Sequence, residues 1–236
     1  MDRNKLYSDI AKRTNGDIYI GVVGPVRTGK STFIKRFMDV LILPGVENEP
    51  ERTRMIDELP QSANGRAVMT TQPKFVPNEA AEVALSDGTK CRVRLIDCVG
   101  YMVDGASGAE ENGTERMVRT PWFDEEIPFG EAAEIGTRKV MTEHLTIGIV
   151  MTSDGTITDI PRADYVAAER RVIAEMQATG KPFVVVLNSA DADGDGAKVL
   201  AEAMRTDYGV PVLVLDVLHM PQEKAERPRH RFSGRG

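Results

Sequence analysis

The sequence has few cysteines, and this scarcity excludes a fold held together by disulfides. Only two of the 236 residues are cysteines, Cys91 and Cys98. On the single strand predicted around them, the two side chains would lie on opposite faces and roughly 23 Å apart, so they cannot form a disulfide with each other there. Two free thiols are typical of a reducing compartment, and we therefore expect a cytoplasmic protein.

Long apolar runs and an excess of basic residues are also missing. No segment approaches the roughly 18 apolar residues of a membrane-spanning helix, and residues 1–16 lack the apolar core of a signal peptide. The formal net charge is −6 and the pI is about 5.3. This acidity argues against a dedicated nucleic-acid binder, because such proteins carry a basic face. We therefore expect no nucleic-acid partner and no direct membrane span.

The composition and the hydrophobic pattern that remain are those of one α/β domain. Hydrophobic residues make up 41% and charged residues 28% of the chain, an ordinary balance for a soluble globular protein. Helices are predicted over residues 2–13, 30–43, 131–143, 163–179 and 197–208, and strands over residues 17–24, 74–77, 82–86, 90–97, 145–151, 183–188 and 210–215. This alternation predicts a three-layer sandwich with a mostly parallel sheet, to which a hairpin turn at Asp87-Gly88 adds one antiparallel edge strand.

Three segments do not follow this alternation. Residues 47–66 are polar and are expected to form an irregular insertion with a short helix. Residues 100–130 are polar and rich in glycine, which predicts a long loop that is functional or mobile. Residues 221–236 are basic and proline-rich without a core pattern, which predicts a disordered tail after a domain of residues 1–220.

The most informative motif follows the first strand. Its residues are Gly24-Pro25-Val26-Arg27-Thr28-Gly29-Lys30-Ser31, which fit the phosphate-loop pattern G-x-x-x-x-G-K-[ST] in full. The two glycines let the backbone amides point inward at phosphate oxygens, and the lysine reaches the β- and γ-phosphates. The serine hydroxyl binds Mg²⁺, and the following helix aims its positive end at the phosphates. We therefore expect these eight residues, with Thr32 after them, to bind a nucleotide.

Two further elements complete a candidate hydrolytic site. Asp97 ends a strand and is followed by Gly100, a D-x-x-G arrangement in which the carboxylate holds the Mg²⁺ shell and the glycine amide senses the γ-phosphate. Thr70 and Thr71 lie in the loop before the strand at residue 74, where a threonine can close onto the metal and the γ-phosphate. We therefore expect Lys30, Thr70, Thr71 and Asp97 to act in catalysis, and Ser31, Thr71 and Asp97 to hold the metal.

The base-binding region is less definite. Asn188 and Asp191 follow the strand at residues 183–188, where guanine-specific relatives carry N-K-x-D, but Ser189 replaces the lysine. Both residues are candidates for base binding, and the choice between ATP and GTP stays open. Tyr101 occupies the position where many small GTPases carry a glutamine that positions water. Slow hydrolysis, or a charge supplied from residues 116–119 or from a neighbouring subunit, would be consistent with that replacement.

One apparent calcium motif is better explained by the fold. Residues 191–202 match the EF-hand pattern D-x-D-x-D-G-x₅-E. An EF-hand loop needs a helix before it, whereas a β-branched strand precedes this one. We interpret the segment as the entry to a helix, with Asp195 near the helix N-terminus.

Several longer segments strongly resemble one family. They are LYSDIAKRTNGDIYIGVVGPVRTGKSTFIKRFM, TTQPKFVPNEA, RLIDCVGYMVDGA and TPWFDEEIPFGEAAEIGTRKVM. Together they resemble the ATPase domain of the stage IV sporulation protein A family, which is similar to translation-factor-related GTPases, and the likeness runs from about Met1 to about His219. In that family the phosphate-loop lysine matches Lys30, the magnesium-shell aspartate matches Asp97, and the sensor threonines match Thr70 and Thr71.

The resemblance implies an activity and partners that the motifs alone do not. It implies Mg²⁺-dependent ATP hydrolysis that drives self-assembly of the spore coat basement layer on the forespore surface, in the mother-cell cytoplasm. It also implies contact with further copies of the chain, with a small amphipathic membrane-anchoring peptide and with other coat proteins. Family members continue past this region with a middle and a C-terminal domain.

Two alternatives to an ATPase remain at this stage. A GTP-dependent molecular switch is favoured by the retained Asn188 and Asp191. A non-catalytic assembly module, stabilised by bound nucleotide, is favoured by Tyr101 in place of a water-positioning glutamine.

Overall fold

The protein is built around a six-stranded sheet with the strand order β10-β9-β8-β1-β3-β2. The structure is a computed structural model that describes residues 17–60, 72–84, 90–106, 110–111 and 113–220. The strands are β1 (Asp17–Val23), β2 (Lys74–Ala84), β3 (Lys90–Asp97), β8 (Ile147–Ser153), β9 (Phe183–Asn188) and β10 (Val212–Leu215). All neighbouring pairs are parallel except β2 with β3, so the predicted antiparallel edge strand is confirmed.

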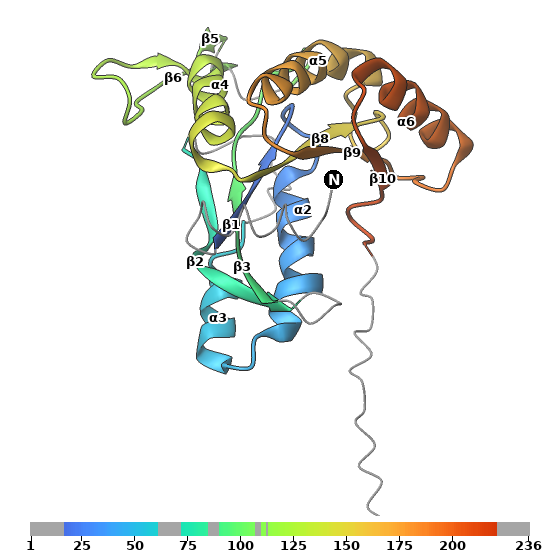
Figure 1. The fold of residues 1–236 in the computed structure, drawn as a ribbon. Helices are drawn as coiled ribbons and strands as arrows, with labels where there is room; N and C mark the ends of the chain where they lie inside the picture. Colours follow the sequence, from blue (N-terminus) through green and yellow to red (C-terminus); the bar gives the residue numbers. More distant parts are fainter. Residues whose placement is uncertain (1–16, 61–71, 85–89, 107–109, 112, 221–236) are drawn as a thin grey trace, which may run out of the picture.

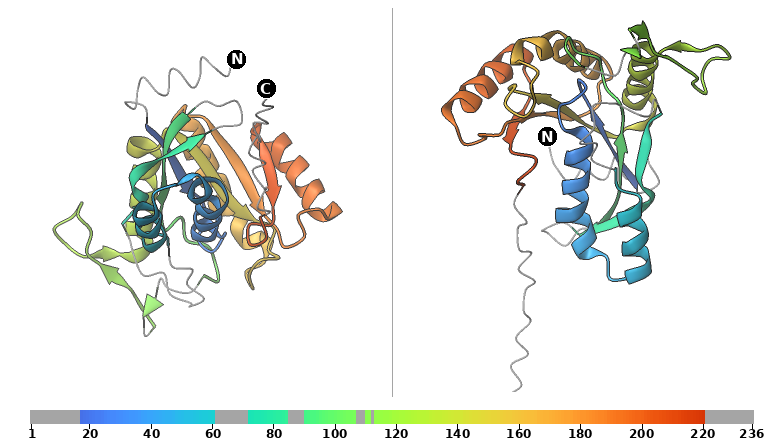
Figure 2. Two further views of the ribbon diagram at one scale, coloured as in Figure 1. Left: turned by 90° about the horizontal axis from the view of Figure 1, so that it is seen from below. Right: turned by 180° about the vertical axis from the view of Figure 1, so that it is seen from behind.

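Helices cover both faces of this sheet, as Figures 1 and 2 show. On one face lie α2 (Lys30–Phe37) and α3 (Glu49–Asp57), whose buried side chains share a core with β1 and β3. On the other face lie α4 (Phe129–Lys139), α5 (Arg162–Ala178) and α6 (Asp195–Tyr208). The predicted three-layer α/β sandwich is therefore confirmed.

The alternating side chains of β1 explain why the sheet has two cores. Ile18 and Val22 are buried against α2, whereas Val23 is buried in the core on the opposite face. The flanking strands β8 and β9 are apolar on both faces, as expected for interior parallel strands. The site-bearing strands β1 and β3 are therefore held from both sides.

Several element boundaries differ from the sequence prediction. The helix predicted over residues 30–43 changes after Phe37 into the π-helix η1 (Met38–Ile42) and the 3₁₀ turn η2 (Leu43–Gly45). The helix at α4 likewise ends in a π-helix, η3 (Val140–His144). The two short strands predicted at residues 74–77 and 82–86 are one strand, β2, which pairs with β3 on both sides of a register shift between Val76 and Ala81.

The segment predicted as a long loop contains regular structure. Within residues 100–130, β4 (Glu110–Glu111) pairs with β5 (Thr114–Glu115), and β6 (Met117–Val118) pairs with β7 (Ile127–Pro128). These small antiparallel pairs project from the domain beside α4. The prediction of one long loop was therefore wrong for the residues of these four short strands.

The two cysteines lie on opposite faces of the sheet, as predicted. Cys91 packs against the core on the α2 side, whereas Cys98 is buried in the core on the opposite side, and both are free thiols. Among the described residues, no helix combines the length and the apolar character needed to cross a bilayer.

Candidate functional site

The site lies where the central strands β1 and β3 end side by side. The parallel register pairs Val22 with Asp97, so the turn after β1 and the carboxylate that ends β3 lie at the same edge of the sheet. Ligands of open α/β sheets bind outside the carboxyl ends of the strands. The predicted phosphate loop connects β1 directly to α2, which begins at Lys30.

Two glycines allow the chain to turn tightly here. Gly24 has φ +135°, and a Cβ on it would lie 2.1 Å from the backbone oxygen of Met151. Gly29 has φ +90°, and a Cβ there would lie 2.5 Å from Nδ2 of Asn188. Gly29 is also the N-cap of α2, so the free amides of the first helical turn are directed at the space above the loop.

Lys30 is a buried cation whose partners are neutral backbone oxygens. Its side chain is 5% exposed, and Nζ donates to the oxygens of Pro25 (2.6 Å) and Gly24 (3.4 Å). Burial lowers the pKa of Lys30, although the Cys98 thiol and the Asp97 carboxyl act in the opposite direction. An anion brought to the loop would compensate the buried charge, as a phosphate does.

Asp97 has one carboxylate oxygen that is hydrogen-bonded and one that is buried without a partner among the described residues. Its Oδ2 accepts a hydrogen bond from Oγ of Ser31 at 2.8 Å. Its Oδ1 is buried, and no hydrogen-bond partner for it is present within the described part of the chain. Burial raises the pKa of Asp97, whereas the Ser31 hydroxyl and the Lys30 charge lower it. A hydroxyl and a carboxylate with a free buried oxygen are the donor set that Mg²⁺ and its waters take, so these residues fit that ion.

The segment after Asp97 lies directly on the phosphate loop. The amide of Tyr101 donates to the oxygen of Gly24 at 3.2 Å, and the amide of Val26 donates to the oxygen of Tyr101 at 2.8 Å. Gly100 has φ +99°, and a Cβ on it would lie 2.1 Å from the Gly24 oxygen. The Gly100 amide, predicted to sense a γ-phosphate, donates to Oγ1 of Thr137 in α4 at 3.1 Å. This segment therefore couples the loop to α4.

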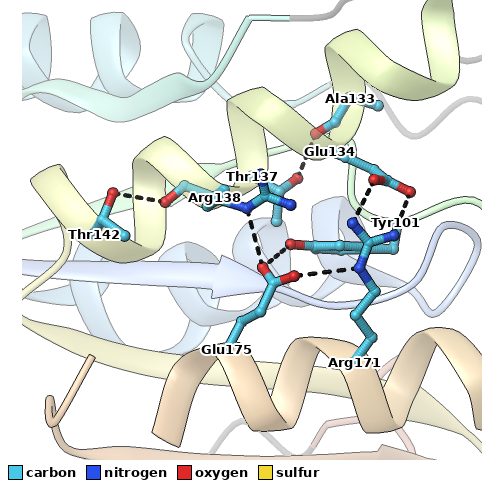
Figure 3. Close-up of polar contacts among 8 residues, drawn as sticks. All are labelled: Tyr101, Ala133, Glu134, Thr137, Arg138, Thr142, Arg171 and Glu175. Carbon is cyan, nitrogen blue, oxygen red and sulfur yellow. Dashed lines mark hydrogen bonds and ion pairs between the residues drawn. The ribbon is translucent and has the colours of Figure 1, made fainter. Parts of the chain in front are cut away.

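The side chain of Tyr101, at the position where many small GTPases carry a glutamine, is buried and held by residues of α4 and α5. Its ring is 1% exposed, and its hydroxyl donates to Glu175 in α5 (Figure 3). Arg171 lies over the ring, 4.9 Å from its centroid, and also bonds Glu175 at 3.2 Å. Arg138 of α4 reaches the same carboxylate at 3.4 Å. Burial, followed by the bond to Glu175, raises the pKa of Tyr101 above its ordinary value.

We expect Tyr101→Phe to weaken the fold but not the chemistry. The change removes the hydroxyl and keeps the ring, so it should lower the free energy of unfolding by about 1–2 kcal/mol in urea denaturation. Nucleotide turnover should stay within about threefold of the wild type, because the hydroxyl points at α5. A large fall in turnover without a loss of stability would show that the hydroxyl takes part in the reaction.

Asn188 connects the phosphate loop to the end of the sheet. Its Nδ2 donates to the oxygen of Thr28 at 3.1 Å, and its Oδ1 accepts from the amide of Val217 at 3.2 Å. Asp191 is exposed in the next turn, whereas Ser189 is fully buried. Base binding by Asn188 and Asp191 stays a prediction, and the contacts of Asn188 are those of a residue that shapes the loop.

Thr137 is a site residue that the sequence did not reveal. It is fully buried, and its hydroxyl donates to the oxygen of Ala133 while accepting from Gly100. A threonine inside a helix carries no motif, so only the packing of α4 on the loop shows its position. Thr70 and Thr71 lie outside the described residues, and their parts as sensors and metal ligand stay predictions.

The arginines and the acidic motif considered from sequence have other surroundings. Arg116 lies over the ring of Phe129 at 4.8 Å, and Arg119 pairs with Glu126 at 3.3 Å. The acidic segment connects β9 to α6, and Asp195 is the first residue of that helix. The interpretation of this segment as a helix entry is confirmed.

Comparison with known proteins shows the family to which the chain is similar. Residues 1–228 match the family described as stage IV sporulation protein A, ATPase domain. Stage IV sporulation protein A of Bacillus subtilis (strain 168) is 54% identical over 220 residues, which are 93% of this chain and 45% of that protein. The Clostridioides difficile (strain 630) protein of the same name is 50% identical over 94% of this chain and 45% of its own length.

These relatives set the extent of the match. A third relative of the same name, from Bacillus anthracis, is 52% identical over 92% of this chain and 44% of its own length. The chain thus spans about half the length of the curated relatives that it matches. In the structure, Ser31 of the phosphate loop and Asp97 are bonded to each other in one site. Because the family match also covers nearly the whole chain, the chain belongs to the stage IV sporulation protein A family and carries its ATPase domain.

Proposed function

We propose that this chain binds ATP with Mg²⁺ and hydrolyses it, and that hydrolysis drives assembly of a coat layer on the forespore surface, in the mother-cell cytoplasm. The main support is the pairing of Ser31 with Asp97 beside the buried ammonium of Lys30. Bound magnesium would neutralise charge that develops on the phosphates. The first-turn amides of α2 and Lys30 hold the phosphates, while Ser31 and Asp97 hold the ion and its waters.

The proposed role in coat assembly follows from membership of the stage IV sporulation protein A family. We propose that the partners are further copies of the chain, a small amphipathic peptide that anchors the protein to the membrane, and other coat proteins. The two small antiparallel pairs β4–β5 and β6–β7 project beside α4, which bonds the Gly100 amide through Thr137. A change of the Gly100 contact on nucleotide binding would thus be transmitted to α4.

A direct test compares ATP and GTP with the purified chain. Phosphate release should require Mg²⁺ and should be faster with ATP than with GTP at equal concentration, and sedimentation should detect an assembled product only after hydrolysis. A GTP-dependent switch, which the retained Asn188 and Asp191 favour, would show the opposite preference. Binding without any phosphate release over hours would instead support a nucleotide-stabilised module, which the fixed Tyr101 favours.

We expect Asp97→Asn to raise the Mg²⁺ requirement. The amide keeps the contact with Ser31 but lacks the negative charge that holds the ion and its waters, so half-maximal turnover should need about 10- to 100-fold more magnesium. Magnesium titration of phosphate release measures this change. Asp207→Asn, an exposed substitution on α6, is the matched control and should not move the titration. An unchanged requirement in Asp97→Asn would place the metal elsewhere.

A further inference from the structure

Negative charge develops on the phosphates during phosphoryl transfer, and a positive group has to stabilise it. Tyr101 is buried and bonded to Glu175, and Arg138 and Arg171 are bonded to the same carboxylate. Phosphoryl-transfer enzymes commonly use an arginine for this charge, from the same chain or from a partner. The phosphate loop itself contains one arginine, Arg27.

The backbone of Arg27 adopts a conformation that an arginine does not favour. Its φ is +60°, and among the residues that the structure describes it is the one non-glycine with positive φ. Such a conformation costs on the order of 1 kcal/mol for a residue with a Cβ. Tyr165 of α5 contacts this turn, because its hydroxyl donates to the backbone oxygen of Arg27 at 3.4 Å. Glycine would fit this position without strain, so the cost of the arginine calls for a compensating role.

The side chain of Arg27 has no strong structural role. It is 32% exposed, and within the described part of the chain its one ion pair is with Asp159, at 4.0 Å, whose side chain is 92% exposed. An exposed pair at this distance contributes little to stability. Arg162 shows the contrast, because it makes two bonds of 2.5 and 2.8 Å to the fully buried Glu169. Among the described residues, the guanidinium of Arg27 is therefore not held by a strong ion pair of the kind that holds Arg162.

We propose that Arg27 is a catalytic residue that supplies, from within the phosphate loop, the positive charge stabilising the transferring γ-phosphoryl group. The inference rests on the proposed hydrolase function. In the reaction, the oxygen of water forms a bond to the γ-phosphorus while the bond from that phosphorus to the bridging oxygen breaks. The bond's electron pair stays on the β-phosphate of ADP, and the proton of water passes to the phosphate products. The guanidinium contacts the γ-phosphoryl oxygens as this charge shifts.

The test separates nucleotide binding from catalysis. Arg27→Ala should lower kcat for ATP on the order of 10³-fold, while the affinities for ADP and for a slowly hydrolysed ATP analogue stay within about threefold. Binding of ADP with aluminium fluoride, which mimics the transferring group, should be lost in Arg27→Ala and retained by the wild type. Arg27→Lys keeps the positive charge but lacks the planar guanidinium, so its turnover and its binding of ADP with aluminium fluoride should lie between those of Arg27→Ala and the wild type. Thermal unfolding without nucleotide checks that each variant is folded.

Asp159→Asn is the matched control, because it removes the ion pair without touching the arginine. Its turnover should stay within about twofold of the wild type. If Asp159→Asn reproduces the defect, or if Arg27→Ala hydrolyses ATP and captures the fluoride complex like the wild type, the inference is wrong. In a third outcome, the wild type binds ADP with aluminium fluoride, Arg27→Ala does not, and the wild type hydrolyses GTP faster than ATP. That result would contradict the proposed nucleotide but would support the role of Arg27.

Discussion

Lys30→Ala should lower nucleotide turnover on the order of 10³-fold, because it removes the buried ammonium of the phosphate loop. Nucleotide binding should weaken as well. At a concentration of Mg²⁺ and ATP equal to 100 times the dissociation constant, the wild type gains about 2.7 kcal/mol of stability from the ligand. The variant should lose most of that gain, which thermal unfolding with and without nucleotide measures.

The stability of the ligand-free Lys30→Ala protein should not fall. Burial lowers the pKa of Lys30, which means that the folded environment disfavours its charged form. Removing that charge relieves a cost, so the variant should unfold at the same temperature as the wild type or above it. Lys35→Ala, exposed on the same helix, is the control and should leave both turnover and ligand stabilisation unchanged. Equal turnover in Lys30→Ala and the wild type would contradict the site.

Glu169→Ala should cause the largest loss of stability, about 3–5 kcal/mol. The carboxylate is fully buried and accepts hydrogen bonds from Arg162, Thr152 and Tyr208, so it ties α5 to β8 and α6. Its removal leaves the Arg162 guanidinium, whose side chain is 22% exposed, without its carboxylate. The melting temperature should fall by roughly 10 °C.

Two companion variants identify the cause of that loss. Glu202→Ala breaks an exposed pair with Arg205 and should cost less than about 1 kcal/mol. The double change Arg162→Met with Glu169→Leu should recover much of the stability, because it removes both charges together. Burial and the bond to Glu169 raise the pKa of Tyr208 to about 12. In Glu169→Ala, ultraviolet titration should therefore find phenolate forming at lower pH. A small loss of stability in this variant would contradict the network.

The phosphate loop and Asp97 could be predicted because their chemistry depends on local spacing. The loop needs two glycines, a lysine and a hydroxyl in fixed order, and a strand could be recognised before each of the two elements. Parallel pairing of those strands then brings the two elements together. By contrast, the surroundings of Tyr101 depend on Glu175, which lies 74 positions away in sequence and belongs to no motif.

The missed boundaries also have physical reasons. Val76-Pro77 interrupts the alternation of β2, and proline has no amide to donate, so the sequence indicated two strands where the structure has one strand with a register shift. The small pairs β4–β5 and β6–β7 are two residues long on each side, which is too short for a period to be recognised. Asn188 was a candidate for base binding because it stands where guanine-specific relatives carry the asparagine of N-K-x-D. In the structure its side-chain amide instead bonds the backbone of Thr28 and Val217.

The pairing of Val22 with Asp97 also determines when nucleotide can first bind during synthesis. A nascent chain that has emerged only through α2 holds every residue of the loop motif but neither the carboxylate nor the strand that supports it. The segment between β1 and β3 has to form a closed loop before these two strands can pair. Peptides or truncated chains containing the intact motif alone should therefore show no magnesium-dependent affinity, and that affinity should first arise once β3 has been added to the sheet.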